Sequence, residues 1–333
     1  VNSQLLDLNE FMTEEEEETE EEALSVIEIP MNLFFTMSSN FNQVLYDNVE
    51  INQIVGQLVI KDQKVDMTDL SMNLLGGSML MNGFYETTNP EKPGFSYNMN
   101  IKNFDIEQVA SSFEVVTEMA PIAKNTKGRF NTTLTATGNL DQEMMPDLMS
   151  LNGGGTMQTK QVRVEGFKAL DKLAGLLQND NLKRLDIDDT QVDYEFKDGR
   201  VYVEPFDVTM GKTTGTISGS NGFDQSLDYI MKLKVPSDEV GAGEAMTKLN
   251  SQAAGLGMDL KTAKTIDVDV TIKGTATEPK VGVNLKDVAG SVVDDVKEQV
   301  KDKVNEEIDK GKEKALEEAR KQAKIHHMTL ISR

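Results

Sequence analysis

The chain has 333 residues and a formal net charge of −22, from 56 acidic and 34 basic side chains. This excess of negative charge argues against binding nucleic acid, because the phosphate backbone repels such a surface. Cysteine is absent, which excludes disulfides, thiolate nucleophiles and cysteine-based zinc sites, and fits either the cytosol or the periplasm. No apolar run approaches the roughly 18 residues of a membrane-spanning helix, so we expect any anchor upstream of Val1.

The first 24 residues predict a disordered acidic linker. No Lys or Arg precedes Lys61, and the run from Glu14 to Glu22 is almost entirely glutamate. Such a run cannot bury apolar area, so it stays solvated. The alternative interpretation is an acidic tail that binds calcium.

Residues Val26 to Ile101 predict strand after strand, since apolar and polar residues alternate with a period of two. Asp62-Gln63 and Gly76-Gly77 mark turns between these runs, and Asn89–Pro93 marks a loop. The pattern predicts an antiparallel meander with one apolar and one polar face.

The next stretch mixes helices and strands. A helix is predicted from Asp105 to Met119, ended by Pro121, and a second from Phe167 to Leu177, both with apolar residues at helical spacing. Between them the pattern predicts strands Arg129–Gly138 and Thr156–Val164, separated by a glycine-rich turn at Asn152–Gly155.

The meander recurs at a constant offset of 136 residues. Leu58 corresponds to Tyr194, Met67 to Val203 and Gly83 to Gly219, and each copy is predicted to end in a helix, the second one at 237–254. We interpret this as an internal repeat whose modules stack to bury a continuous face. The boundaries are 25–165 for the first module with its helix and 166–285 for the second.

The C-terminal part changes from a strand pattern to a highly charged helical pattern. Strands Thr265–Lys273 and Lys280–Leu285 close the β region, and 286–325 predicts a charged amphipathic helix with an aliphatic residue at every fourth position. Its valine stripe is narrow, so the helix is either solvated or docked on a membrane surface or partner. Residues 326–333 form an ill-patterned tail.

The sequence offers little chemistry. Its only histidines, His326 and His327, lie in that tail. A calcium loop beginning at Asp186 fails because Gln191 and Lys197 stand where glycine and glutamate are required. We therefore expect no catalytic residues, no metal site and no cofactor.

The apolar face of the repeat is rich in methionine, which fills irregular space and suits varied apolar partners. One interpretation is an ordinary packed core. The other is a trough, because few helices are predicted to cover about a dozen strands.

The ordered motifs resemble the C-terminal region of the AsmA-like family of Gram-negative envelope proteins. They are "IPMNLFFTMSSN", then "VEINQIVGQLVIKDQKVDMTDLSMNLLGGSMLMNGFYE", then "GGGTMQTKQVRVEGFKALDKLAGLL", the second-copy hairpins from "DDTQVDYEFKDGRVYVEPF" onward and the closing "TIKGTATEPKV". The resemblance covers about residues 26 to 285.

The resemblance implies a periplasmic β-groove, anchored to the inner membrane upstream, that shields or conducts phospholipids between membranes in outer-membrane biogenesis. The expected fold is mainly β with peripheral helices (α+β), a repeated antiparallel meander forming a long curved sheet or groove. Its partners would be phospholipid acyl chains, the membrane and other envelope proteins. The alternative function is a scaffold that regulates targeting or assembly of outer-membrane proteins through protein contacts. The positions expected to line the groove are Leu58, Ile60, Val65, Met67, Met79, Met81, Tyr97, Met99, Val201, Val203, Ile217, Tyr229 and Met231.

Overall fold

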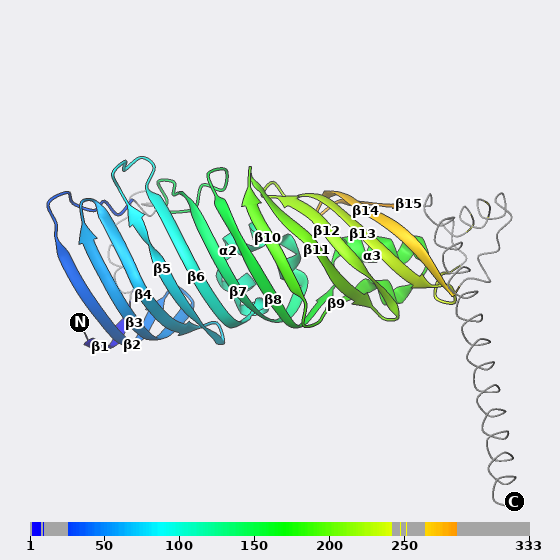
Figure 1. Ribbon diagram of the computed structural model, residues 1–333, viewed down its shortest axis with the longest axis horizontal. Helices are drawn as coiled ribbons and strands as arrows, with labels where there is room; N and C mark the ends of the chain where they lie inside the picture. Colours follow the sequence, from blue (N-terminus) through cyan, green and yellow to red (C-terminus); the bar gives the residue numbers. More distant parts are fainter. Residues whose placement is uncertain are drawn as a thin grey trace, which may run out of the picture.

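The computed structural model describes residues 2–7, 9, 26–241, 247, 251 and 264–284. They build one long sheet of 15 strands, drawn out along a single axis (Figure 1), which confirms the mainly β prediction. The acidic run, the charged helix at 286–325, the tail and most of the predicted helix at 237–254 lie outside these residues. The strands are β1 (Asn2–Asp7), β2 (Phe35–Tyr46), β3 (Val49–Lys61), β4 (Lys64–Leu74), β5 (Gly77–Glu86), β6 (Gly94–Asp105), β7 (Thr126–Asn139), β8 (Asn152–Glu165), β9 (Arg184–Ile187), β10 (Gln191–Lys197), β11 (Arg200–Met210), β12 (Thr213–Gly222), β13 (Ser226–Pro236), β14 (Thr265–Thr275) and β15 (Pro279–Asn284).

The strands follow one another in chain order, so the sheet is a meander, in which short turns alternate with longer connections such as 106–125 and 166–183 that carry the helices. From β2 onward every neighbouring pair is antiparallel, and only the short β9 lies off the main path, beside β8 and β11. The sheet runs without interruption across the expected module boundary, because β8 pairs with β7 on one side and β10 on the other.

The linker prediction for residues 1–24 is wrong at its start. Asn2–Asp7 forms β1, which pairs in parallel with β2 through partners such as Leu6 and Val44. Nothing local in a six-residue segment specifies a parallel partner almost forty residues away, so the pairing is set by tertiary structure.

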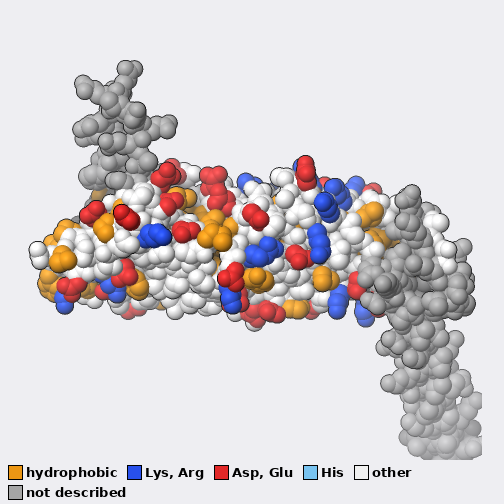
Figure 2. Space-filling view, turned by 90° about the horizontal axis from the view of Figure 1, so that it is seen from above, with side chains coloured by type: hydrophobic (Ala, Val, Ile, Leu, Met, Phe, Trp, Pro, Cys, Tyr) orange, Lys and Arg blue, Asp and Glu red, His pale blue; other side chains and the backbone are white. Residues whose placement is uncertain are grey.

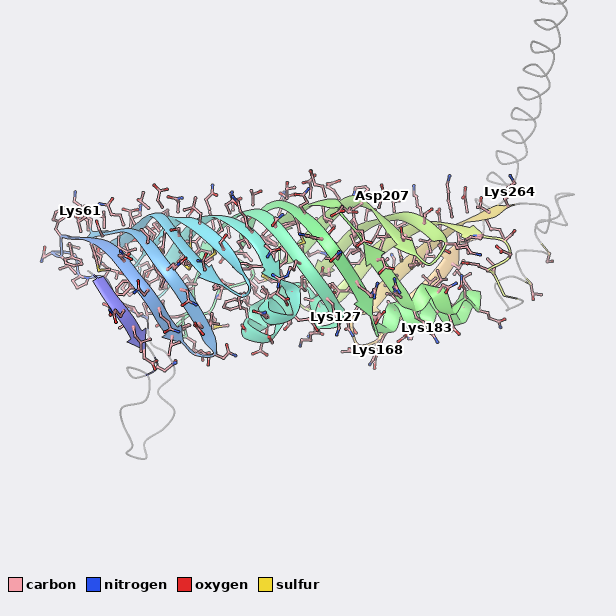
Figure 3. All side chains as sticks on the ribbon, turned by 90° about the horizontal axis from the view of Figure 1, so that it is seen from below. Lys61, Lys127, Lys168, Lys183, Asp207 and Lys264 are labelled. Carbon is pink, nitrogen blue, oxygen red and sulfur yellow. The ribbon has the colours of Figure 1, made fainter. Side chains whose placement is uncertain are left out.

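All helices with a described position lie on one face of the sheet, here called the inner face, and Figure 3 shows the sheet arching over them. They are α1 (Ile106–Ser112), α2 (Glu114–Met119) and α3 (Lys168–Leu177), with the 3₁₀ turns η2 (Pro121–Asn125) and η3 (Asp180–Lys183). The single helix predicted over 105–119 is therefore two, separated at Phe113, whose backbone is extended. Asp105 caps α1 by accepting a hydrogen bond from the backbone of Gln108.

The glycine-rich turn predicted at Asn152–Gly155 is also wrong, since these residues begin β8. A Cβ on Gly155 would meet the Thr133 carbonyl and lie 3.1 Å from the Tyr194 hydroxyl, so the glycine leaves room for a tyrosine from β10. Glycines within a strand allow a side chain from a neighbouring strand to approach the backbone closely, and they need not indicate a turn.

The register of hydrogen bonding repeats along with the sequence. Met67 pairs with Gly83 and a bulge precedes the next pair, Leu70 with Met81. In the second copy Val203 pairs with Gly219 and a bulge again precedes Phe206 with Ile217, each position shifted by 136 residues. Bulges bend strands and are conserved geometric features, so shared bulges show that the two modules curve in the same way.

Three buried apolar clusters occupy the inner face. The largest surrounds α3, which contributes Leu170, Leu173 and Leu177 against strands β8 to β14. A second lies under α1 and includes Val109, Ile101 and Phe104. The third lies in the middle of the sheet and includes Phe95, Phe196 and Val201.

Gly219 is expected to be essential for the second module. Its φ of +144° disfavours any side chain, and a Cβ would meet the Asp228 carbonyl and stand 2.6 Å from the Tyr229 Cα. We expect Gly219→Ala to lower the free energy of unfolding by about 2–4 kcal/mol, measured by urea denaturation.

Gly175 provides the matched control. It lies in α3, and an added Cβ there would have nothing within 4 Å, so Gly175→Ala should raise stability by up to about 1 kcal/mol through helix propensity. Equal effects of the two substitutions would contradict this account of Gly219.

Candidate apolar site

All thirteen residues expected to line a groove lie on the inner face. The pairing connects them across the sheet: Leu58 opposes Met67, Met81 opposes Met99 and Ile217 opposes Met231. Alternation alone allows either face, and the structure places this set on the face that carries the helices. None of the thirteen is exposed, and they differ in what covers them.

The C-terminal members of the set fill a packed core. Ile217 and Met231 are 8% and 1% exposed and belong to the cluster around α3, with Tyr229 packed against it. Val201 is buried in the middle cluster, and Val203 packs on that cluster. These five positions lie among side chains of the protein itself, so we exclude them from the candidate site.

Three members near the middle of the sheet are also covered. Met79 and Met99 pack against the cluster under α1, and Tyr97 packs against the middle cluster. Tyr97 stacks on Phe95 with ring centroids 5.3 Å apart, over the space left by Gly83. They adjoin the remaining five positions, because Met99 pairs with Met81 and Tyr97 pairs with Gly83.

Five members remain half-buried and belong to none of the three clusters found among the described residues: Leu58, Ile60, Val65, Met67 and Met81. They lie together on β3, β4 and β5, because Leu58 pairs with Met67 and Ile60 pairs with Val65. We call these five residues the open section.

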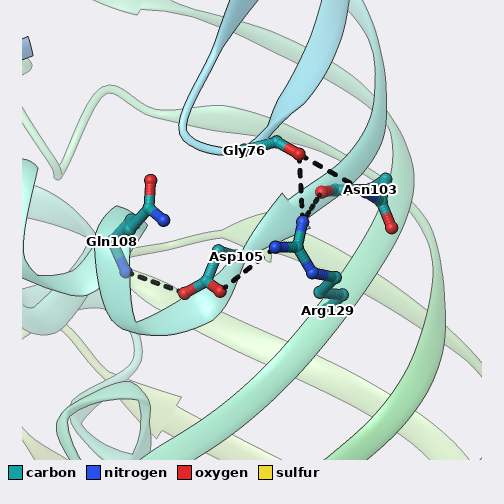
Figure 4. A network of polar contacts seen from close by, with 5 residues as sticks. All are labelled: Gly76, Asn103, Asp105, Gln108 and Arg129. Carbon is teal, nitrogen blue, oxygen red and sulfur yellow. Dashed lines mark hydrogen bonds and ion pairs between the residues drawn. The ribbon is translucent and has the colours of Figure 1, made fainter. Parts of the chain in front are cut away.

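A polar network fastens α1 to the sheet beside the β4–β5 turn (Figure 4). Arg129 Nη1 donates to the carbonyl oxygens of Gly76 at 3.0 Å and Asn103 at 2.9 Å, and Nη2 lies 3.7 Å from Asp105 Oδ2. Since Asp105 also caps α1, one guanidinium joins the β4–β5 turn, the β6 bulge and the helix start.

A second anchor fixes the end of α2. The Tyr229 hydroxyl donates to Asn221 Oδ1 at 2.8 Å, and Asn221 Nδ2 donates to the Met119 carbonyl. Burial raises the pKa of Tyr229 well above its ordinary value, against the opposing charge of Arg200, so the hydroxyl remains a donor. The two anchors fix α1 and α2 against the inner face.

The segment before β2 is fastened by two hydrogen bonds. The Ile29 amide donates to Thr87 Oγ1 at 2.8 Å, and the Tyr85 hydroxyl donates to the Ile27 carbonyl at 3.0 Å. Burial, with a smaller contribution from Glu28, raises the pKa of Tyr85, which keeps that donor protonated. Only Ile29 of this segment is buried, and the segment leads into β2, whose first residue, Phe35, pairs with Ile60 of the open section.

The site is apolar in its chemistry. Among the described residues no group of three or more His, Cys, Asp or Glu side chains could hold a metal ion. Within the same residues no helix is both long and apolar enough to cross a bilayer. The residues predicted to line the groove did not include Phe34 and Phe35. The signal that could have identified them is the mostly apolar run "IPMNLFF", which contains a proline.

Arg129 is expected to contribute more to stability than its surface position suggests. We expect Arg129→Ala to lower the free energy of unfolding by about 1–3 kcal/mol, because two carbonyls lose a charged donor. Lys127→Ala is the control, since its ion pair with Glu107 is exposed on both sides and should change stability by less than about 0.5 kcal/mol. Chemical denaturation of both variants measures the difference, and an Arg129 effect as small as that of Lys127 would contradict the anchoring role.

Comparison with known proteins gives no relative: no family model, curated protein or solved structure matches the chain.

Proposed function

We propose that this protein is a non-enzymatic envelope protein that holds phospholipid acyl chains against the open section. In this proposal it resides in the periplasm of a Gram-negative cell, anchored upstream to the inner membrane, and shields lipid in transit between membranes. The resemblance of its ordered motifs to the AsmA-like family supports the compartment and the lipid substrate.

One observation carries the proposal: a single apolar face is packed over most of its length and half-buried at five adjoining positions. Leu58, Ile60, Val65, Met67 and Met81 continue the face that α1 and α3 cover elsewhere. Contiguous apolar area left accessible on a folded protein commonly marks a binding site. The adaptable methionines among these residues suit a ligand of variable shape.

An acyl chain is the ligand that fits this chemistry. Each methylene moved from water to an apolar surface contributes about 0.8 kcal/mol, so several methylenes in contact with the open section give useful affinity without any polar recognition. The headgroup would remain in water.

The second copy of the repeat provides a variant that tests the proposal. At the positions of Leu58 and Ile60 it carries Tyr194 and Phe196, whose rings lie 5.4 Å apart within the middle cluster. The pairing is the same in both copies, since Leu58 and Ile60 oppose Met67 and Val65 as Tyr194 and Phe196 oppose Val203 and Val201.

We expect the wild-type chain to bind a monomeric fluorescent fatty acid, used below its critical micelle concentration, and to retain phospholipid in native mass spectrometry. The double variant Leu58→Tyr, Ile60→Phe should weaken fatty-acid binding at least about tenfold, because bulkier rings occupy the open section. Its unfolding midpoint reports on folding. Absence of fatty-acid and phospholipid binding by the wild type would refute the proposal.

A pair of charge substitutions at equivalent positions separates an open surface from a core. Met81 and Ile217 correspond in the two copies, but Met81 is half-buried and Ile217 is 8% exposed. We expect Met81→Glu to abolish fatty-acid binding while costing less than about 2 kcal/mol of stability, and Ile217→Glu to cost about 3 kcal/mol or more. Thermal unfolding and ligand titration measure both. Similar losses of stability at the two positions would show that the open section is core.

A further inference from the structure

An exposed apolar segment stands at one end of the sheet. In Ile27–Phe35, here called the apolar edge segment, five large apolar side chains are exposed within nine residues. In Figure 2 apolar side chains are visible at the end of the molecule that carries β2. The exposed side chains are Ile27, Met31, Leu33, Phe34 and Phe35.

The fold itself presents these side chains to solvent. The backbone is fastened by the bonds from Ile29 to Thr87 and from Tyr85 to Ile27, and by a turn in which the Leu33 amide donates to the Pro30 carbonyl at 3.3 Å. Phe34, at 71% exposed, lies between this turn and the start of β2. The exposure is thus a property of an anchored segment, and it costs hydration free energy until something covers it.

The charge of the surroundings selects the kind of partner. Residues 26–60 contain Glu28, Asp47 and Glu50 and no Lys or Arg, and Lys61, which follows, lies 3.5 Å from the carboxylate of Asp62. Such a surface gains nothing from an anionic membrane or an acidic protein, since like charges repel. It is compatible with a surface that carries no net charge.

We propose that the apolar edge segment inserts into the surface of a zwitterionic phospholipid bilayer. Residues 26–34 have irregular backbone and offer a protein partner no strand to pair with, whereas a lipid surface deforms around protruding side chains. The segment is also continuous with the open section, because Phe35 pairs with Ile60. This inference goes beyond the proposed function and does not require lipid to be bound in the open section.

Vesicle flotation tests the proposal. The 333-residue chain should float with phosphatidylcholine vesicles, equally at low and high salt, and added phosphatidylglycerol should not increase the bound fraction. Phe34→Ser and, separately, Met31→Ser should each reduce partitioning about tenfold, as expected for the loss of one large buried apolar side chain.

Met149→Ser is the matched control. Met149 is 72% exposed, as Phe34 is, but it lies in the loop between β7 and β8, so this variant should float like the wild type. Flotation that requires phosphatidylglycerol or disappears at high salt would overturn the proposal, as would no flotation or equal loss in all three variants.

Self-association would also overturn the proposal. If sedimentation without vesicles shows a dimer that Phe34→Ser abolishes, the segment serves a second copy of the chain rather than a bilayer. The fatty-acid assay uses a monomeric ligand and needs no bilayer, so failure of flotation and failure of the proposed lipid binding are separate results.

Discussion

The structure depends on the alternation of a single continuous sheet, which sends every second side chain to the same face. A meander of this length therefore has one long apolar face, whose exposure to water is unfavourable. A single open sheet has no second layer of its own to bury that face. The chain provides few covering elements among its described residues, and it distributes them unevenly. The proposed binding site lies on the part of the apolar face that these elements do not bury.

The inner face is most completely buried over the C-terminal strands, where α3 packs on it. The five buried residues of α3 lie on one side of the helix, and the three leucines among them each contribute about 1.5–3 kcal/mol by burial. The last described strands complete this core, since Ile266, Val268 and Val270 are fully buried beside Leu233. Over the open section no helix of the described chain does the same, because the cluster that contains Val109 of α1 reaches β3–β5 at Val49, Met72 and Met79 but includes none of the five open-section residues.

Sequence patterns predicted what is local. The strands around Leu58 and Tyr194, the turn at Asp62-Gln63 and the helix at Phe167–Leu177 follow from periods of 2 and 3.6 residues and from turn chemistry. The 136-residue offset predicted a shared strand order, and the structure adds a shared bulge.

Features set by distant contacts were not predictable in this way. The parallel pairing of β1 depends on β2, and the glycines of β8 form a strand because Tyr194 lies above Gly155. Likewise, the division of the inner face into packed and open parts depends on where helices dock. That information is distributed over the tertiary structure, so thirteen equivalent apolar positions look alike in the sequence and differ in the fold.

The two copies show how one backbone can carry different inner-face side chains. Where the second copy places Tyr194, its hydroxyl lies 2.8 Å from Thr132 Oγ1, and burial raises the pKa of this phenol against the lowering effect of that hydrogen bond. The ring and its bond fill the interior above β8. The first copy has Leu58 there in the same register, a smaller side chain that needs no polar partner. A packed module can thus hold the shape of the sheet while its copy keeps half-buried apolar positions, and in the proposed function stability and binding do not compete for the same residues.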